Sequence, residues 1–257
     1  MSINNPVTGS IARAARVIDV LAHANNGAGL TEIMTQSEFS KTTTFRVLAA
    51  LQNVKYVFQD PENREYRLGH KFTELARTAA RAHIASIAMQ SMKRLADRSE
   101  DTVFLSIPEG ASSICVSRSV GAFPIRTLTL DKGDERPLGV GAGSLALYCS
   151  MTDARRSAAC RVNRNWLAEY GTSHEELEVK FTDFQSKGYA LNRGGVVSGM
   201  SALAVPIVTA EGRLVAAMAI GAIDERMDND RIDKLLLPML REEATQIALR
   251  LGDINKE

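Results

Sequence analysis

Apolar positions in the N-terminal part of the chain repeat at the spacing of three short helices and then of a hairpin. Three helices are expected: one over 11–24 after a Ser10 cap, a short one that begins at a Thr31 cap, and one from a Ser40 cap to about Asn53. Two strands are expected at 56–59 and 65–68. In the third helix, Phe45 and Leu48 are expected to face inward. The run Asp60-Pro61-Glu62-Asn63 favours a turn between the strands. This order of elements predicts a winged helix-turn-helix.

A longer helical pattern follows, from Lys71 to about Ser99, with no proline or glycine inside it. Its first half carries an apolar stripe formed by Phe72, Leu75, Ala76 and Ala79. We therefore expect the domains to meet within a helical linker. The predicted organisation is a winged helix-turn-helix at 10–70, a linker helix at 71–85 and a second domain at 86–252.

Beyond residue 100 the pattern changes to short strands interrupted by helices. Strands are expected at 102–107, 114–118, 125–130, 189–192, 201–208 and 214–222. Helices are expected after Gly141-Ala142-Gly143, from the Ser173 and Glu176 capping box to Gly188, and over 228–251 with a kink at Pro238. Strands in hairpins with helices around them predict an α+β fold with an antiparallel sheet.

Composition narrows the class of protein. The 257 residues are 45% hydrophobic and 24% charged, and the net charge is only +1. Residues 1–85 hold 10 Lys and Arg against 7 Asp and Glu, which is weak evidence for an anionic partner. Three cysteines without paired spacing predict neither a disulfide framework nor a metal site, and no cofactor motif is present. Without a membrane-spanning run or a secretory leader, we expect a cytoplasmic protein with no membrane partner.

The start of the third helix has the chemistry of a DNA-recognition helix. In a helix-turn-helix, the first turns of this helix meet base edges and phosphates in the major groove. Hydroxyls and cations suit both kinds of contact, and the helix N-terminus itself favours phosphate. The candidate DNA-binding residues are Ser40, Lys41, Thr42, Thr43, Thr44 and Arg46 on the helix, with Arg64 and Arg67 on the hairpin.

Several motifs in this order resemble the IclR family of bacterial regulators. They are Ser10-Ile11-Ala12-Arg13-Ala14, Gly29-Leu30-Thr31-Glu32-Ile33, the segment from Lys41 to Leu48, Tyr66-Arg67-Leu68-Gly69, Asp101 to Leu105, Arg136-Pro137-Leu138, Gly141-Ala142-Gly143 and Ser198 to Ala204. The resemblance implies a winged helix-turn-helix, a linker helix used in dimerisation and a GAF-like effector domain. It also implies binding to double-stranded promoter DNA as a homodimer or homotetramer, often as a repressor, under the control of a small organic acid.

A pocket for that acid is expected at the N-terminus of the helix after Gly141, Ala142 and Gly143, where backbone N–H groups and the helix dipole favour a carboxylate. The alternative is that these glycines serve tight packing of strand and helix. The resemblance implies four further pocket positions, which are Asn192, Ala202, Ala219 and Gly221. Because three of them are small and apolar, a roomy, dry cavity for an acid with an aromatic or aliphatic body is expected.

Two other functions compete with this interpretation. One is an enzyme, or a protein that binds a small carboxylate, with a vestigial winged helix; the other is a winged-helix module that docks on proteins. The sequence shows no convergent acid–base pair, which disfavours the enzyme. The polar run Thr42-Thr43-Thr44 disfavours protein docking, for which exposed apolar residues are expected. The charge run 131–136 is interpreted as a solvated loop.

Overall fold

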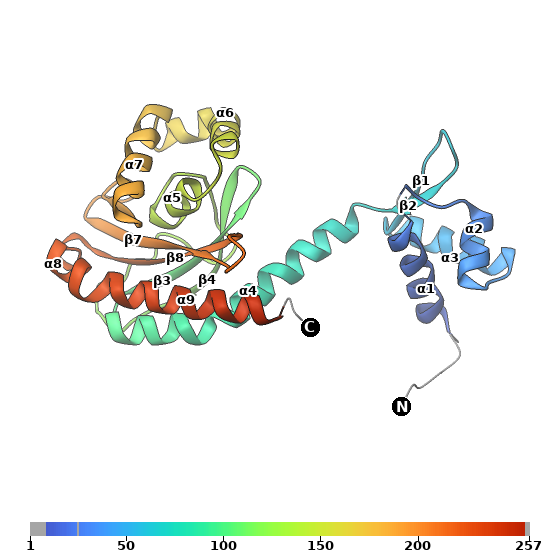
Figure 1. The fold of residues 1–257 in the computed structure, drawn as a ribbon, viewed down its shortest axis with the longest axis horizontal. Coiled ribbons are helices and arrows are strands. Elements are labelled where there is room, and N and C mark those ends of the chain that lie inside the picture. The colour runs from blue at the N-terminus through green and yellow to red at the C-terminus, as the bar shows by residue number, and fades with distance from the viewer. Residues whose placement is uncertain (1–8, 25, 255–257) are drawn as a thin grey trace. The chain divides into compact units, whose positions relative to one another are not determined.

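The computed structural model describes residues 9–24 and 26–254. The chain divides between Ala80 and Arg81 into an N-terminal module and a C-terminal domain. This boundary lies inside the long helix α4 (Lys71–Ser99), which both units share (Figure 1). Each unit is described by itself below.

The N-terminal module is a winged helix-turn-helix, as the sequence predicts. Its elements are α1 (Ser10–His23), α2 (Leu30–Ser37), α3 (Lys41–Asn53), β1 (Val57–Gln59) and β2 (Tyr66–Leu68). The small core is formed by Val17, Ile33 and Leu48, which come from the three helices and are almost completely buried. Because β1 and β2 pair as an antiparallel hairpin, they form the wing.

The helix caps follow the prediction at one position and differ at two. Ser40 caps α3, and its hydroxyl accepts a hydrogen bond from the Thr43 backbone at 3.4 Å. The other two helices begin after Gly9 and Gly29, so Ser10 and Thr31 lie inside their helices.

The inward face of α3 also differs from the prediction. Phe45 is 59% exposed, whereas Thr44 is completely buried. Thr44 shares a helix face with Leu48 and Leu51, at i, i+4 and i+7, and its hydroxyl donates to the Ser40 carbonyl at 3.1 Å. Burial is therefore tolerated because the hydroxyl keeps a hydrogen-bond partner.

The C-terminal domain is built on an antiparallel sheet. Within the described residues the sheet has six strands in the order β5-β4-β3-β8-β7-β6. These strands are β3 (Thr102–Glu109), β4 (Ser112–Ser119), β5 (Glu135–Pro137), β6 (Ala190–Arg193), β7 (Met200–Val208) and β8 (Leu214–Ile223).

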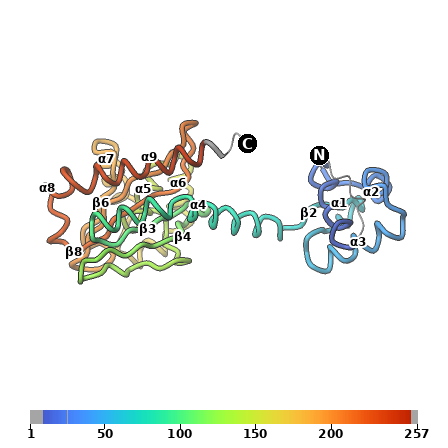
Figure 2. Tube along the Cα trace, turned by 90° about the horizontal axis from the view of Figure 1, so that it is seen from below, coloured from blue at the N-terminus to red at the C-terminus, as the bar shows by residue number. Residues whose placement is uncertain are grey.

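Helices cover both faces of this sheet. The second half of α4 and α9 (Leu237–Ile254) pack on one face, and α5 (Ala142–Cys149), α6 (Asp153–Glu169) and α7 (His174–Lys187) lie over the other (Figures 1 and 2). Along β3, Val103 and Leu105 join the α4–α9 core, whereas Phe104 joins the α5 core. Because both faces are covered, the central strands β3 and β8 are mostly apolar instead of alternating strictly with polar residues.

The third predicted strand is wrong. Residues 125–130 form no strand, because the free edge of β4 pairs with β5, where Ser113 lies opposite Arg136. The 131–136 run is therefore only partly a loop, and its last two residues begin β5. The turn after β3 also comes later than predicted, since Pro108 and Glu109 still pair with β4.

Two helical segments differ from the sequence prediction. Helix α6 was not predicted at all. The expected helix over 228–251 consists of α8 (Asn229–Arg231), a π-helical turn over Ile232–Leu236 and α9. Pro238 lies in the first turn of α9 and cannot donate a backbone hydrogen bond, which fits a wider turn just before it. No helix in the described part of the chain is long and apolar enough to cross a membrane.

Candidate DNA-binding helix and effector pocket

The exposed first turns of α3 form the candidate DNA-binding surface. Ser40, Lys41, Thr42 and Arg46 are exposed, and Thr43 is half-buried beside Ser40, whose hydroxyl donates to it at 3.1 Å. Thr44 must be removed from the predicted set, because its side chain is buried under α3 and cannot reach a ligand. The remaining residues present hydroxyls and two cations at the N-terminus of a helix.

The two wing arginines lie in different surroundings. Arg64 is exposed in the turn between β1 and β2, with a left-handed backbone (φ 62°). Arg67 is half-buried and forms ion pairs with Asp60 at 3.6 Å and Glu65 at 3.4 Å. Arg67 thus holds the wing together, and Arg64 is the freer cation of the two.

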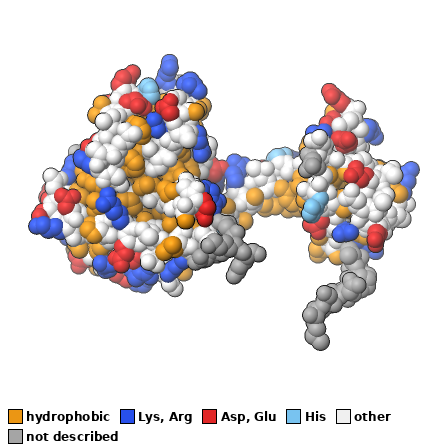
Figure 3. All heavy atoms as spheres, in the orientation of Figure 1, with side chains coloured by type: hydrophobic (Ala, Val, Ile, Leu, Met, Phe, Trp, Pro, Cys, Tyr) orange, Lys and Arg blue, Asp and Glu red, His pale blue; other side chains and the backbone are white. Residues whose placement is uncertain are grey.

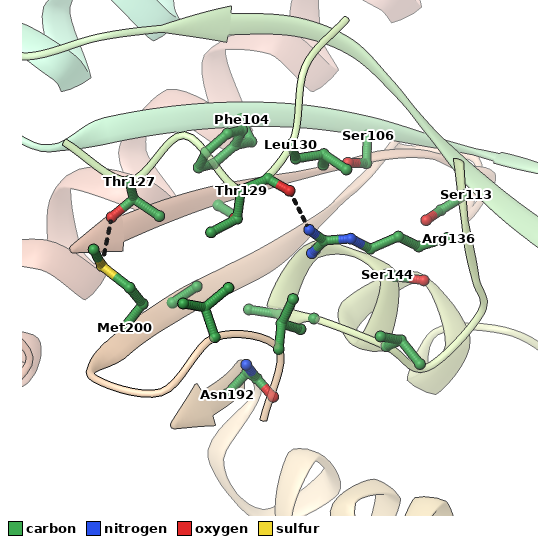
Figure 4. A pocket seen from close by; sticks show the side chains of 18 of the residues that line it. Phe104, Ser106, Ser113, Thr127, Thr129, Leu130, Arg136, Ser144, Asn192 and Met200 are labelled. Atoms are coloured by element: carbon green, nitrogen blue, oxygen red, sulfur yellow. Dashed lines mark hydrogen bonds between the residues drawn. The ribbon is translucent and has the colours of Figure 1, made fainter. Parts of the chain in front are cut away.

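The predicted effector site is a small cavity between the sheet and the N-terminus of α5, which we call the inner cavity (Figure 4). Its volume is about 50 Å³. Six of the seven predicted pocket residues line it, namely Gly141, Ala142, Gly143, Asn192, Ala202 and Ala219.

Gly221 does not line the inner cavity. A Cβ at this position would lie 3.1 Å from both Phe104 Cε2 and Thr127 Cγ2. Glycine is therefore needed because the Phe104 ring and Thr127 fill the space above β8. The four positions implied by the family resemblance thus separate into three that line the cavity and one that supports a neighbour of the cavity.

The cavity is smaller than the roomy one expected from the sequence. Phe104, Leu130 and Val196 fill the space left by the small alanines. Most of the lining is apolar, and six hydroxyl side chains join it, from Ser106, Ser113, Thr127, Thr129, Ser144 and Ser201. Sequence reasoning missed Thr127 and Thr129 because residues 125–130 were assigned to a strand, whereas they cross over the cavity.

Arg136 is the most important residue that sequence reasoning missed. Its side chain reaches from β5 toward the inner cavity, and Nη2 donates to the Thr129 carbonyl at 2.5 Å (Figure 4). Burial lowers the pKa of this guanidinium, which reports a desolvated cation. Among the residues that the structure describes, no carboxylate forms an ion pair with Arg136. A half-buried cation without an acidic partner is a favourable site for an anion.

The glycines at the start of α5 let the helix pack closely on the sheet and leave room for the Arg136 side chain. Gly141 has φ 77°, and a Cβ there would lie 2.9 Å from Arg136 Nη1. A Cβ at Gly143 would lie 3.8 Å from the Ala219 Cβ, an ordinary contact that lets α5 lie close on the sheet. The Ser144 hydroxyl donates to the Pro137 carbonyl at 2.9 Å and joins α5 to β5. The helix N-terminus and Arg136 therefore face the same small space.

Cys115 and Cys149 do not form a reactive-thiol site. Burial raises the pKa of the Cys115 thiol to about 11 and that of Cys149 to about 12, so both stay protonated and unreactive. No group of three His, Cys, Asp or Glu side chains in the described part of the chain could hold a metal ion.

Comparisons with known proteins agree on the class of both units. The IclR helix-turn-helix domain matches residues 10–61, and the bacterial transcriptional regulator IclR C-terminal domain matches residues 76–249. The HTH-type transcriptional regulator XynR of Escherichia coli is 25% identical over 96% of this chain and 97% of its own. The HTH-type transcriptional repressor AllR of Escherichia coli is 24% identical over 95% of this chain and 90% of its own.

Solved structures show the same fold. The Thermotoga maritima IclR structure has a TM-score of 0.60 at 18% identity and covers 95% of this chain and 98% of its own. An IclR-family regulator from Rhodococcus sp. has a TM-score of 0.66 at 23% identity, with 97% and 96% covered. The two family-model matches exclude the enzyme interpretation, because members of this family are transcription regulators. The chain belongs to the IclR family of bacterial transcriptional regulators, with a DNA-binding helix-turn-helix module followed by the family's C-terminal domain.

Proposed function

We propose that the protein binds promoter DNA in the cytoplasm through the exposed turns of α3, as a homodimer or homotetramer, and that a small organic acid in the inner cavity changes this binding. The observation that carries the second half is Arg136. Its half-buried guanidinium and the N-terminus of α5 converge on one cavity, where a carboxylate would supply the missing negative charge.

A paired experiment tests this function. A gel-shift assay uses the DNA upstream of the protein's own gene, and a thermal-shift screen uses small carboxylates with their neutral amides as controls. We expect specific binding to the DNA, and we expect carboxylates but not amides to raise the melting temperature and alter the gel shift. Equal effects of acids and amides would contradict an anion site at Arg136.

We expect Arg46→Ala to weaken binding to specific and unrelated DNA alike, because a phosphate contact does not depend on sequence. The slope of log affinity against log salt should become shallower by about 0.9 for each lost phosphate contact. Filter binding over a range of salt concentrations measures both effects. Thr43→Val is the matched comparison, since it should change the preference at a base position and leave the salt slope unchanged. An unaltered slope for Arg46→Ala would exclude the phosphate contact.

We also expect at least a homodimer joined through the N-terminal modules and the first half of α4. Apolar side chains lie along one side of this half of α4, where Leu75 is 43% exposed beside the exposed Ala76 and Ala79 (Figure 3). The Phe72 ring already packs against a side chain of its own module, since its centroid lies 5.1 Å from that of the Tyr56 ring. Two recognition helices are needed to read two half-sites about one helical turn apart. Light scattering should give at least twice the 28.0 kDa chain mass, and a monomer at micromolar concentration would contradict the dimer.

A further inference from the structure

The inner cavity is too small for a whole metabolite. At about 50 Å³ it has room for roughly three to five water-sized groups. A carboxylate with one or two further carbons fills that space. A larger acid must therefore extend beyond the inner cavity.

A second hollow adjoins the inner cavity, and we call it the outer cleft. It has a volume of about 380 Å³ and lies between α7, the segment joining α6 to α7, and the backbone before α5. Val140, Gly141 and Asn192 line both spaces, so the two share a wall.

This shared wall is thin because two of its positions lack a side chain. A Cβ at Gly195, which lines the outer cleft, would lie 2.7 Å from Asn192 Oδ1. A Cβ at Gly141 would lie 2.9 Å from Arg136 Nη1 and 3.7 Å from Val196. The side chains of Val140 and Asn192 and the backbone of Gly141 therefore separate the two spaces. In Figure 4, Asn192 lies across the cavity from Arg136.

The surface of the outer cleft is more apolar than polar, and its polar side chains carry balanced charge. Tyr170 and Thr172 contribute hydroxyl groups, and Glu176 and Lys180 contribute one charge of each sign. One oxygen of Glu176 is already used, since it accepts from the Ser173 backbone at 3.2 Å. Lys180 is half-buried beside the cleft. Such a lining offers hydrogen bonds to a neutral hydroxylated group and gives no net attraction for a second carboxylate.

We propose that the outer cleft is a second subsite and that the effector is a hydroxylated carboxylic acid which occupies both spaces. The carboxylate binds Arg136 in the inner cavity, and the hydroxylated body passes Asn192 to hydrogen-bond with Thr172 and Lys180. This proposal rests on the proposed function, because it needs a carboxylate at Arg136. It replaces the apolar acid that the sequence suggested with a polar one.

Calorimetric titration of the full chain with four probe acids tests the two-site arrangement. Glycolate represents the head alone, hexanoate adds an apolar body, adipate adds a second carboxylate, and gluconate has a hydroxylated body of the same length. We expect gluconate to bind about tenfold more tightly than each of the others, since two extra hydrogen bonds suffice for that ratio. Tighter binding of hexanoate or adipate would overturn the proposal and leave an acid-responsive regulator standing.

Variants of outer-cleft residues test whether the tighter binding of gluconate depends on this cleft. Lys180→Ala and Thr172→Val should each weaken gluconate binding roughly five- to tenfold and leave glycolate binding unchanged. Lys234→Ala is the matched control, because this exposed lysine belongs to the opposite face of the sheet. Equal losses for gluconate and glycolate, or no loss for either, would refute the second subsite. If Arg136→Gln leaves the binding of every acid unchanged, the proposed function fails together with this inference.

Discussion

Replacing Arg136 by glutamine is expected to abolish the response of the protein to carboxylates while DNA binding in their absence stays unchanged. A hydrogen bond to a charged group contributes about 1.5–3 kcal/mol, so the affinity for the acid should fall roughly ten- to a hundredfold. The measurement is a titration of the gel shift with the acid that gives the largest thermal shift. Arg155→Gln is the matched control, because Arg155 is an exposed arginine on α6.

The stability of the Arg136→Gln variant separates ligand binding from a structural role. Glutamine removes a desolvated charge that has no acidic partner in the described chain. The melting temperature without ligand should therefore equal or exceed that of the natural protein. A marked decrease would mean that Arg136 supports the fold.

A second variant blocks the inner cavity without changing its charge. Ala219 is 4% exposed and lines the cavity opposite Gly143. Ala219→Leu should occupy the space for the acid at a cost of about 1–3 kcal/mol in stability. The folded variant is expected to bind DNA and ignore the acid. A normal response would place the effector elsewhere.

The N-terminal module could be predicted from sequence because local rules determine most of it. The Ser40 cap and the wing turn depend on neighbouring residues. The same is true of the Ser173 and Glu176 capping box, which the structure confirms at the start of α7. The limit of such rules is seen on α3, where Thr44 is buried instead of the expected Phe45. Apolar character suggests burial, but helix geometry and the hydrogen bond from Thr44 to Ser40 determine which side chain faces the core.

The effector pocket was only partly predictable because it depends on pairings between distant segments. Arg136 lies in a charged run that resembles a loop, and only its pairing opposite Ser113 makes it part of the sheet. Once β5 occupies that edge of β4, residues 125–130 have no strand to pair with, and Thr129 instead lies over the cavity. Neither event has a local signal in the sequence. The position of Arg136 within Arg136-Pro137-Leu138 was the available hint.

The largest expected effect on stability comes from Asp101→Ala. Asp101 follows α4 and is 1% exposed, with Arg226 Nε at 2.9 Å and Arg231 Nη2 at 2.8 Å from its two carboxylate oxygens. Both arginines also donate to the Ser99 carbonyl at 2.9 Å, and Arg226 lies over the Phe123 ring at 3.9 Å. The carboxylate thus joins the end of α4 to the segment after β8.

Removing this carboxylate leaves Arg231 without its acidic partner and leaves Arg226 with only the exposed Glu100, at 3.6 Å. The free energy of unfolding of the C-terminal domain should fall by about 3–5 kcal/mol. Urea unfolding followed by fluorescence measures this, because Trp166 on α6 is the one tryptophan of the sequence and reports on the C-terminal domain. Asp97→Ala is the matched control. Asp97 is exposed and pairs with exposed Lys93 at 2.8 Å, so its loss should cost less than about 1 kcal/mol.

Asp101→Asn separates the lost charge from the lost packing. Asparagine has nearly the same shape and keeps one oxygen that can accept from Arg226 or Arg231, but it carries no charge. Its stability should therefore lie between those of Asp101→Ala and the natural protein. If Asp101→Asn is as stable as the natural protein, the ion pairs contribute nothing beyond hydrogen bonding. If both variants lose less than about 1 kcal/mol, the two arginines are well enough solvated to need no partner.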